Sequence, residues 1–220
     1  MGSVPGDSNL GGLGGVRVTT FNQAAESIVT IGRYCYQRGW LPATSGNISV
    51  RLDDQALALT KSGKNKGELA VADIMQVDMQ GQPLSEGKPS AETLLHCQLY
   101  GWQADIGAVI HTHSPAATTL SVLARGALIF EQREILKAFP GIESHENKIE
   151  IPVFNNDQNM PRLARQVEAY MAESHRHFVA YLIRGHGLYT WGTAMHDAQR
   201  HLEALEFLFE CQLLMGRTQR

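Results

Sequence analysis

The apolar residues of this chain follow two spacings, one typical of helices and one typical of strands. From Phe21 to Arg38 they recur at three- and four-residue steps, which predicts a core helix. A mostly apolar stripe predicts the last long helix over Thr193–Met215. Three further helices are expected. One is opened by Lys88–Glu92 and runs to about Trp102, one is Pro115–Leu123, which is small and apolar, and one is Pro161–Glu173, where the proline suits the first helical position.

Short apolar runs between these helices predict strands. Ile48–Leu52 and Ala56–Thr60 predict a hairpin with two aspartates at its turn. Other strands are expected at Val109–Ile110, Leu128–Phe130, Ile149–Phe154, Val179–Ile183 and Tyr189–Trp191. Strands and helices alternate irregularly, without an internal repeat or a linker. The pattern therefore predicts one α/β domain with a mixed or antiparallel sheet.

The composition is that of an ordinary globular protein with one sizeable domain. The chain has 220 residues, of which 43% are hydrophobic, and its formal net charge is −3. This charge gives no strong attraction to nucleic acid or to an anionic membrane, and no apolar run is long enough to span a bilayer. The cysteines form no CxxC pair and predict buried thiols in a reducing compartment: Cys35, Cys97 and Cys211.

The first residues differ from the rest of the chain. Met1–Gly15 is rich in Gly, Ser and Asn, so we expect a disordered extension before a single domain over residues 16–220. The segment lacks the basic-then-apolar pattern of a signal peptide, which favours a cytoplasmic protein.

The strongest candidate for chemistry is Ala108–Ser114, where β-branched residues lead into a His-x-His pair. Side chains two apart on a strand share a face, so His111 and His113 would lie side by side. Neutral imidazoles placed in this way often begin a divalent-metal site. Two hydrogen-bonded histidines at a strand end are the alternative that the pattern leaves open.

Only one other histidine has a distinctive setting. His186 lies between Gly185 and Gly187, which permit a tight turn and a close approach of another group. The remaining histidines of the C-terminal part are expected on the surface or packed against helices: His175, His177, His196 and His201.

Two loops rich in small and hydroxyl residues are candidates for anion binding. Backbone N–H groups and hydroxyls in Thr44–Asn47 and Thr60–Lys64 can cradle a phosphate. Ordinary turns with solvated lysines are the simpler alternative. Neither loop has Walker spacing, and no GxGxxG motif follows a strand, which argues against a dinucleotide site.

Two acidic positions have competing interpretations. Ser90 is a natural helix N-cap, and Glu92 in the first turn is most simply a capping residue. The acid-rich Glu131–Lys137 is either a charged surface or places one acid inward beside Ile135 and Leu136.

Several short motifs together resemble the class II aldolase/adducin family. Each is weak alone, but their order and intervals are specific, and the match covers nearly the whole chain after the Gly-rich start. The motifs are Thr44-Ser45-Gly46-Asn47, Ser62-Gly63, Pro89-Ser90-x-Glu92, His111-Thr112-His113-Ser114 and Gly185-His186-Gly187.

The resemblance implies a three-layer α/β/α domain around a central, mainly antiparallel sheet. It also implies one zinc ion per subunit, held by His111, His113 and His186, and a homotetramer with sites near subunit interfaces. The residues expected to hold a substrate phosphate are Ser45, Gly46, Asn47, Ser62, Gly63 and Ser90.

Within the family, the chain is most similar to dehydratase members, notably through Glu134-Ile135-Leu136-Lys137. This similarity implies a lyase of methionine salvage that removes water from a methylthio-substituted ketose 1-phosphate. Glu134 matches the acid/base glutamate, and it is expected in a partly apolar pocket with a raised pKa. Glu92 matches the catalytic carboxylate of the sugar-phosphate aldolases, so aldolase or epimerase activity is the alternative. Adducin-like binding modules lack the metal histidines that are present here.

Overall fold

The computed structural model describes residues 19–174 and 178–218. The predicted extension Met1–Gly15 lies outside these residues, and so do His175 and His177. The centre is a seven-stranded sheet with strand order β3-β2-β1-β4-β9-β8-β7. The bounds are β1 Asn47–Arg51, β2 Ala56–Thr60, β3 Ile74–Asp78, β4 Ala108–Thr112, β7 Val153–Phe154, β8 Ala180–Ile183 and β9 Gly187–Gly192.

Every neighbouring pair in this sheet is antiparallel except β7 with β8. A separate two-stranded sheet pairs β5 (Leu128–Glu131) with β6 (Lys148–Ile151). The expectation of one α/β domain around a mainly antiparallel sheet is therefore confirmed.

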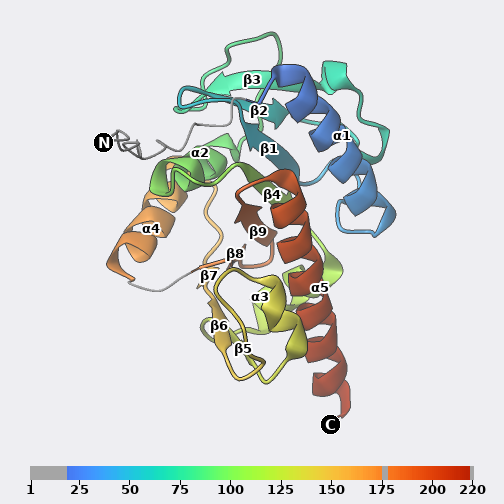
Figure 1. Cartoon of the computed structure of the whole chain (residues 1–220), viewed down its shortest axis with the longest axis vertical. Helices are drawn as coiled ribbons and strands as arrows, with labels where there is room; N and C mark the ends of the chain where they lie inside the picture. The colour runs from blue at the N-terminus through green and yellow to red at the C-terminus, as the bar shows by residue number, and fades with distance from the viewer. Residues whose placement is uncertain (1–18, 175–177, 219–220) are drawn as a thin grey trace, which may run out of the picture.

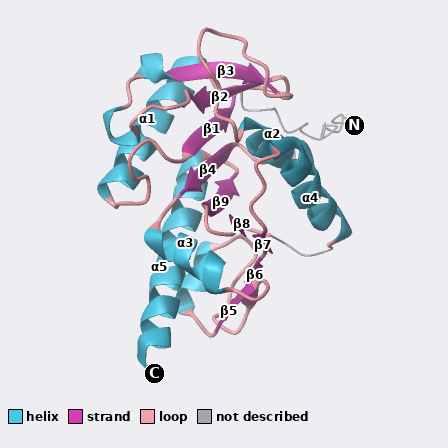
Figure 2. Cartoon of the chain, turned by 180° about the vertical axis from the view of Figure 1, so that it is seen from behind, coloured by secondary structure: helices cyan, strands magenta, loops and turns pink. Residues whose placement is uncertain are grey.

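Helices cover both faces of the sheet and complete three layers. Helices α2 and α4 lie together on one side, and α1 and α5 lie on the other (Figures 1 and 2). Each side has its own apolar cluster of buried residues, as the sheet residues alternate between the two faces. The helices are α1 Phe21–Gln37, α2 Thr93–Trp102, α3 Pro115–Leu123, α4 Met160–Glu173 and α5 Met195–Thr218. Within the described residues, no helix combines the length and apolarity needed to cross a bilayer.

The predicted single strand over Ile149–Phe154 is wrong. Proline has no N–H to donate to a strand ladder, and Pro152 divides the segment into β6 and β7. The two halves join different sheets, and the Pro152 carbonyl accepts a hydrogen bond from Leu182 N–H at 2.8 Å.

The predicted start of α2 is also wrong. The helix begins at Thr93, and Glu92 precedes it without making a side-chain cap. The Ser90 hydroxyl accepts hydrogen bonds from the Asn47 amide at 3.1 Å and from the backbone N–H of Glu92 at 3.3 Å, both of which precede the first helical residue. Glu92 is therefore free of the capping role that its position suggested.

The three central strands set a row of side chains across the sheet. The pairing register places Asn47 of β1 opposite His111 of β4, and His111 opposite Tyr189 of β9. The His111 and Tyr189 rings stack with their centroids 3.9 Å apart. This row fixes the His111 imidazole on the central strand, whose backbone pairs with a neighbouring strand on each side.

Candidate metal centre and phosphate pocket

Four side chains from separate parts of the chain converge at one end of β4. His111 lies on the strand, His113 follows it, His186 comes from the turn between β8 and β9, and Glu92 precedes α2. One possible ligand atom from each lies within 4.8 Å of all the others. The Nε2 atom of His111 is 2.8 Å from that of His113 and 3.3 Å from that of His186.

Close backbone approach makes this convergence possible. A Cβ atom on Gly187 would lie 2.0 Å from the carbonyl oxygen of Thr112, so only glycine fits against the metal-site strand. Gly185 has a φ of +65°, in the left-handed region that glycine tolerates best. The two glycines thus have the roles expected of them: Gly185 permits the tight turn, and Gly187 permits the close approach of β4.

The environment of the histidines favours their neutral, metal-binding form. The Nδ1–H of His111 donates to the Leu188 carbonyl at 2.9 Å, which leaves a lone pair on Nε2. Burial lowers the pKa of His111 well below its usual value. Burial, followed by the nearby His186, lowers the pKa of His113 to about 4. At neutral pH these rings do not carry protons that would exclude a cation.

Glu92 faces the same point as a carboxylate. Its Oε1 lies 3.0 Å from His186 Nε2, and its Oε2 accepts a hydrogen bond from the Asn47 amide at 2.5 Å. Burial opposes its ionisation, but the His186 hydrogen bond, the neighbouring imidazoles and Asn47 outweigh this and hold its pKa well below the usual range. The interpretation of Glu92 as a capping residue is therefore wrong.

The donor set fits a divalent cation. Three imidazole nitrogens and one carboxylate oxygen are ligands that Zn²⁺ accepts, and several other transition metals bind the same types. The structure supports a metal site built from the three predicted histidines, with Glu92 as an additional donor.

The residues expected to bind phosphate line one pocket of about 260 Å³ beside these donors. His113 and Glu92 form part of the same wall. The predicted residues in its lining are Ser45, Gly46, Asn47, Ser62, Gly63 and Ser90. Residues from three distant segments are thus brought together, and their role in binding a phosphate stays a prediction.

Sequence reasoning missed a lysine in this pocket. Lys66 is only 2% exposed, and its ammonium donates to the carbonyls of Thr44 and Lys64, each at 2.8 Å. Burial lowers its pKa to about 8. The more obvious Lys61 donates to the Ala72 carbonyl, while Lys64 pairs with an aspartate. Nothing local in the sequence distinguishes Lys66 from a solvated lysine.

Glu134 does not join this cluster within its own chain. Its side chain is 72% exposed and lies 2.5 Å from the Lys137 ammonium. The hydrogen bond from Lys137 lowers its pKa, so the single chain does not provide the apolar pocket and raised pKa that were expected. Its segment is a 3₁₀ helix, Glu134–Ala138, in which Leu136 turns into the core and Glu134 turns to solvent.

The metal interpretation predicts that His113→Ala abolishes stoichiometric metal binding while the protein remains folded, because one of the converging donors is removed. Metal content after dialysis and far-UV circular dichroism would measure the two properties. His196→Ala, at an exposed position on α5, is the control and should retain the metal. Full metal content in His113→Ala would contradict this assignment.

Comparison with known proteins agrees with this geometry. Residues 26–213 match the family model of the class II aldolase and adducin N-terminal domain. The chain is 54% identical over 193 residues to a methylthioribulose-1-phosphate dehydratase of Pseudomonas aeruginosa, covering 87% of this chain and 94% of the relative. A Marinobacter nauticus protein of the same name is 50% identical over 206 residues, covering 92% and 99%.

Solved structures show the same fold. YgbL of Klebsiella pneumoniae, described as a putative aldolase/epimerase/decarboxylase, has a TM-score of 0.77 and 26% identity, covering 90% of this chain and 92% of that one. An L-fuculose-1-phosphate aldolase of Thermus thermophilus has a TM-score of 0.73 and 26% identity, covering 91% and 98%. With its motifs, its layers and its cluster of three histidines and a glutamate in agreement, the chain belongs to the class II aldolase and adducin N-terminal domain family.

Proposed function

We propose that this protein is a methylthioribulose-1-phosphate dehydratase, a hydro-lyase of methionine salvage. It would convert 5-methylthioribulose 1-phosphate into 2,3-diketo-5-methylthiopentyl 1-phosphate and water. The observation that carries the proposal is the 50–54% identity to curated dehydratases over most of the chain. A complete set of metal donors beside a polar pocket supports it.

The proposed cofactor is one zinc ion per chain, held by His111, His113 and His186. Glu92 stands beside them as a further ligand or as a base. When bound, the cation supplies Lewis-acid stabilisation of the negative charge that develops on substrate oxygens.

The proposed phosphate site is the pocket between the two polar loops. Ser45 and Ser62 line it, and the buried Lys66 supplies a positive charge. Since His113 and Glu92 share this pocket, a phosphate on C1 would bring C2 and C3 of the ketose close to the metal donors.

The reaction requires loss of a C3 proton and protonation of the departing C4 hydroxyl. Glu92, as a carboxylate beside the metal donors, would take the C3 proton, and we assign the acid role at C4 to Glu134. In its own chain this carboxyl is exposed and ionised, so it needs burial elsewhere to hold a proton at neutral pH. The proposal therefore includes a homotetramer in which Glu134 of one copy reaches the pocket of another. Contact with that apolar surface would raise the pKa of Glu134.

A sugar-phosphate aldolase is the second candidate. Glu92 among the metal donors is compatible with it, because aldolases of this family use a glutamate at this position, but the same residue is equally compatible with the dehydratase. An aldolase would break the C3–C4 bond, whereas the dehydratase keeps the carbon skeleton. An adducin-like binding module is disfavoured because all three metal histidines are present.

The direct test is turnover of methylthioribulose 1-phosphate by the zinc-loaded protein, with products identified by mass. We expect loss of one water with the carbon skeleton intact. A three-carbon phosphate together with an aldehyde would instead identify an aldolase. No reaction with zinc bound would overturn the substrate assignment while leaving the metal site standing.

The acid role of Glu134 predicts that Glu134→Gln keeps its zinc and loses turnover by about a hundredfold or more, the usual scale for acid–base catalysis. Glu131→Gln, at a nearby exposed position, is the matched control and should retain its rate. An unchanged rate in Glu134→Gln would move the acid/base role to Glu92.

The charge of Lys66 predicts that Lys66→Met raises the KM for the phosphorylated substrate by about 10–100-fold, the scale of a charge-assisted hydrogen bond. The pKa of Lys66 is lowered to about 8, so its charge is present below that pH and lost above it. The wild-type KM should therefore rise above about pH 8, and the variant should lose this dependence. Lys64→Met, which removes an exposed lysine of the same loop, is the control; equal effects of the two substitutions would refute the role.

A further inference from the structure

Strand β1 and helix α2 face each other with two matching rows of polar side chains. Alternate strand residues share a face and repeat about every 6.6–6.8 Å, while helix residues four apart share a face and repeat about every 6 Å. Because these repeats are nearly equal, each residue of the strand row can lie opposite a residue of the helix-side row. The strand row is Asn47, Ser49 and Arg51, and the helix-side row is Glu92, His96 and Tyr100.

The side chains of the two rows form one continuous chain of hydrogen bonds. Asn47 contacts both Glu92, at 2.5 Å, and the Nε2 atom of His96. Ser49 Oγ lies 2.7 Å from His96 Nδ1 and 2.9 Å from the Tyr100 hydroxyl. The four members that follow Glu92 are each at most 2% exposed, so water does not offer alternative partners: Asn47, His96, Ser49 and Tyr100.

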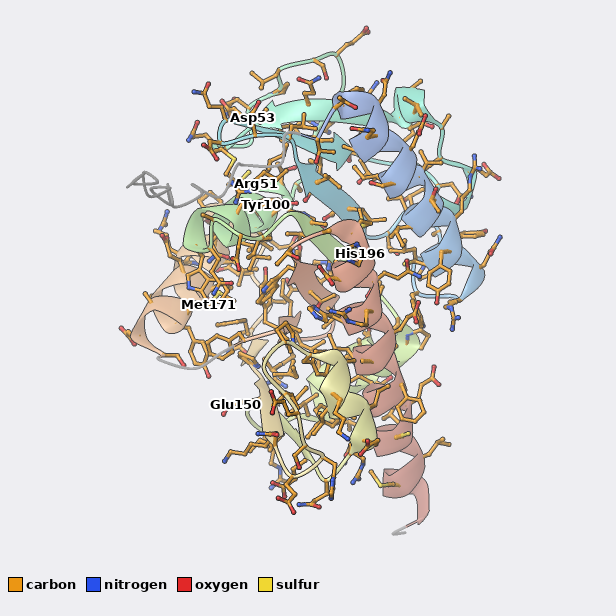
Figure 3. All side chains as sticks on the ribbon, in the orientation of Figure 1. Arg51, Asp53, Tyr100, Glu150, Met171 and His196 are labelled. Carbon is orange, nitrogen blue, oxygen red and sulfur yellow. The ribbon has the colours of Figure 1, made fainter. Side chains whose placement is uncertain are left out.

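Arg51 closes the far end of these rows at the surface. Its guanidinium lies over the Tyr100 ring, 5.0 Å from the centroid, and donates to the Tyr100 carbonyl at 2.7 Å. Figure 3 shows the two side chains next to each other. The chain of hydrogen bonds therefore runs from the surface at Arg51 inward to the metal donors.

The direction of every hydrogen in the chain follows from its inner end. Ionised Glu92 only accepts, so the NH₂ of Asn47 faces it and the Asn47 Oδ1 faces His96. The Nε2 of His96 must then carry the proton, which leaves Nδ1 as the acceptor.

The same logic continues outward from His96. The Ser49 hydroxyl donates to His96 Nδ1, and the Tyr100 hydroxyl in turn donates to Ser49. All the donors thus point toward Glu92. A flipped Asn47 amide would set its oxygen against the carboxylate, so His96 and Glu92 together select one amide orientation.

Asn47 has no spare donor in this arrangement. Its second N–H points to the Ser90 hydroxyl at 3.1 Å. The Asn47 amide occupies Glu92 Oε2, which leaves Oε1 to face His186 at 3.0 Å. The orientation of the carboxylate at the metal donors therefore depends on the amide behind it.

We propose that His96 is a positioning residue for this site. Held in its Nε2–H tautomer by Ser49, it fixes the Asn47 amide and so aims Glu92 at the three metal histidines. Burial lowers the pKa of His96 to about 4, which keeps the ring neutral and able to both donate and accept. This inference rests on the proposed function only in treating the four converging side chains as its metal site.

The test uses the folded protein with Zn²⁺ alone and needs no substrate. Ser49→Ala and His96→Leu should each weaken Zn²⁺ binding about 10–100-fold, the usual effect of losing a partner that orients a ligand. The dissociation constant would be measured by competition with a chelator. Tyr100→Phe removes only the outermost donor, so its effect should be smaller than that of Ser49→Ala.

Thr190→Val is the matched control for a merely structural defect. Thr190 is fully buried and its hydroxyl donates to the Val179 carbonyl at 2.8 Å, so the substitution removes a buried hydrogen bond outside the chain of donors. It should leave Zn²⁺ affinity within about threefold of wild type. An equal loss in Thr190→Val and Ser49→Ala would overturn the proposal.

Histidine ¹⁵N NMR supplies an independent readout. We expect the wild-type His96 signals to show a proton on Nε2 and none on Nδ1, and Ser49→Ala to lose this preference. A wild-type proton on Nδ1, or unchanged Zn²⁺ affinity in both Ser49→Ala and His96→Leu, would refute the positioning role. Failure of the dehydration assay would instead overturn the proposed function and leave these two measurements unaffected.

Discussion

The structure depends on holding four Lewis-basic side chains within 4.8 Å of one another. Burying polar groups with few partners costs free energy, so the surrounding chain must offset that cost. The Leu188 carbonyl orients His111, and the Asn47 amide orients Glu92. The Cβ-free backbone of Gly187 lets the His186 turn approach β4. A cation that binds only this folded arrangement adds its binding free energy to the stability of the fold.

The sheet makes this arrangement rigid because β4 is its central strand, with β1 and β9 on either side. The same three strands supply His111, Asn47 and Tyr189 from one cross-strand row. The side chains that line the pocket differ in charge from one part of it to another. Burial keeps His111 and His113 neutral, whereas Lys66 keeps a positive charge at neutral pH. The proposed metal and phosphate sites therefore lie at adjacent but chemically distinct positions of one cavity.

Local patterns predicted the elements and the histidines well, because each has a signal within a few residues. Strand alternation placed His111 beside His113, and flanking glycines marked His186. The function of Glu92 was not predictable in this way. Its position resembles a helix cap, but Asn47, 45 residues earlier, draws the side chain away. Lys66 was missed for the same reason: its burial results from the tertiary packing of the Thr44 and Lys64 carbonyls around it.

Glu134 shows the limit of reasoning from one chain. Of the two interpretations of this acid-rich segment, an inward acid beside Ile135 and Leu136 is not found in the single chain: Leu136 is buried, but the same turn directs Glu134 outward. An exposed carboxylate paired with Lys137 is a poor proton donor at neutral pH. The four converging donors suit either removal of water or cleavage of a carbon bond, since both begin with charge on the same oxygens. What distinguishes the two reactions is the group beside C4. In the proposed assembly, the donors held by the rigid sheet therefore serve the step that both reactions share. Glu134, on a separate exposed turn, determines which product forms.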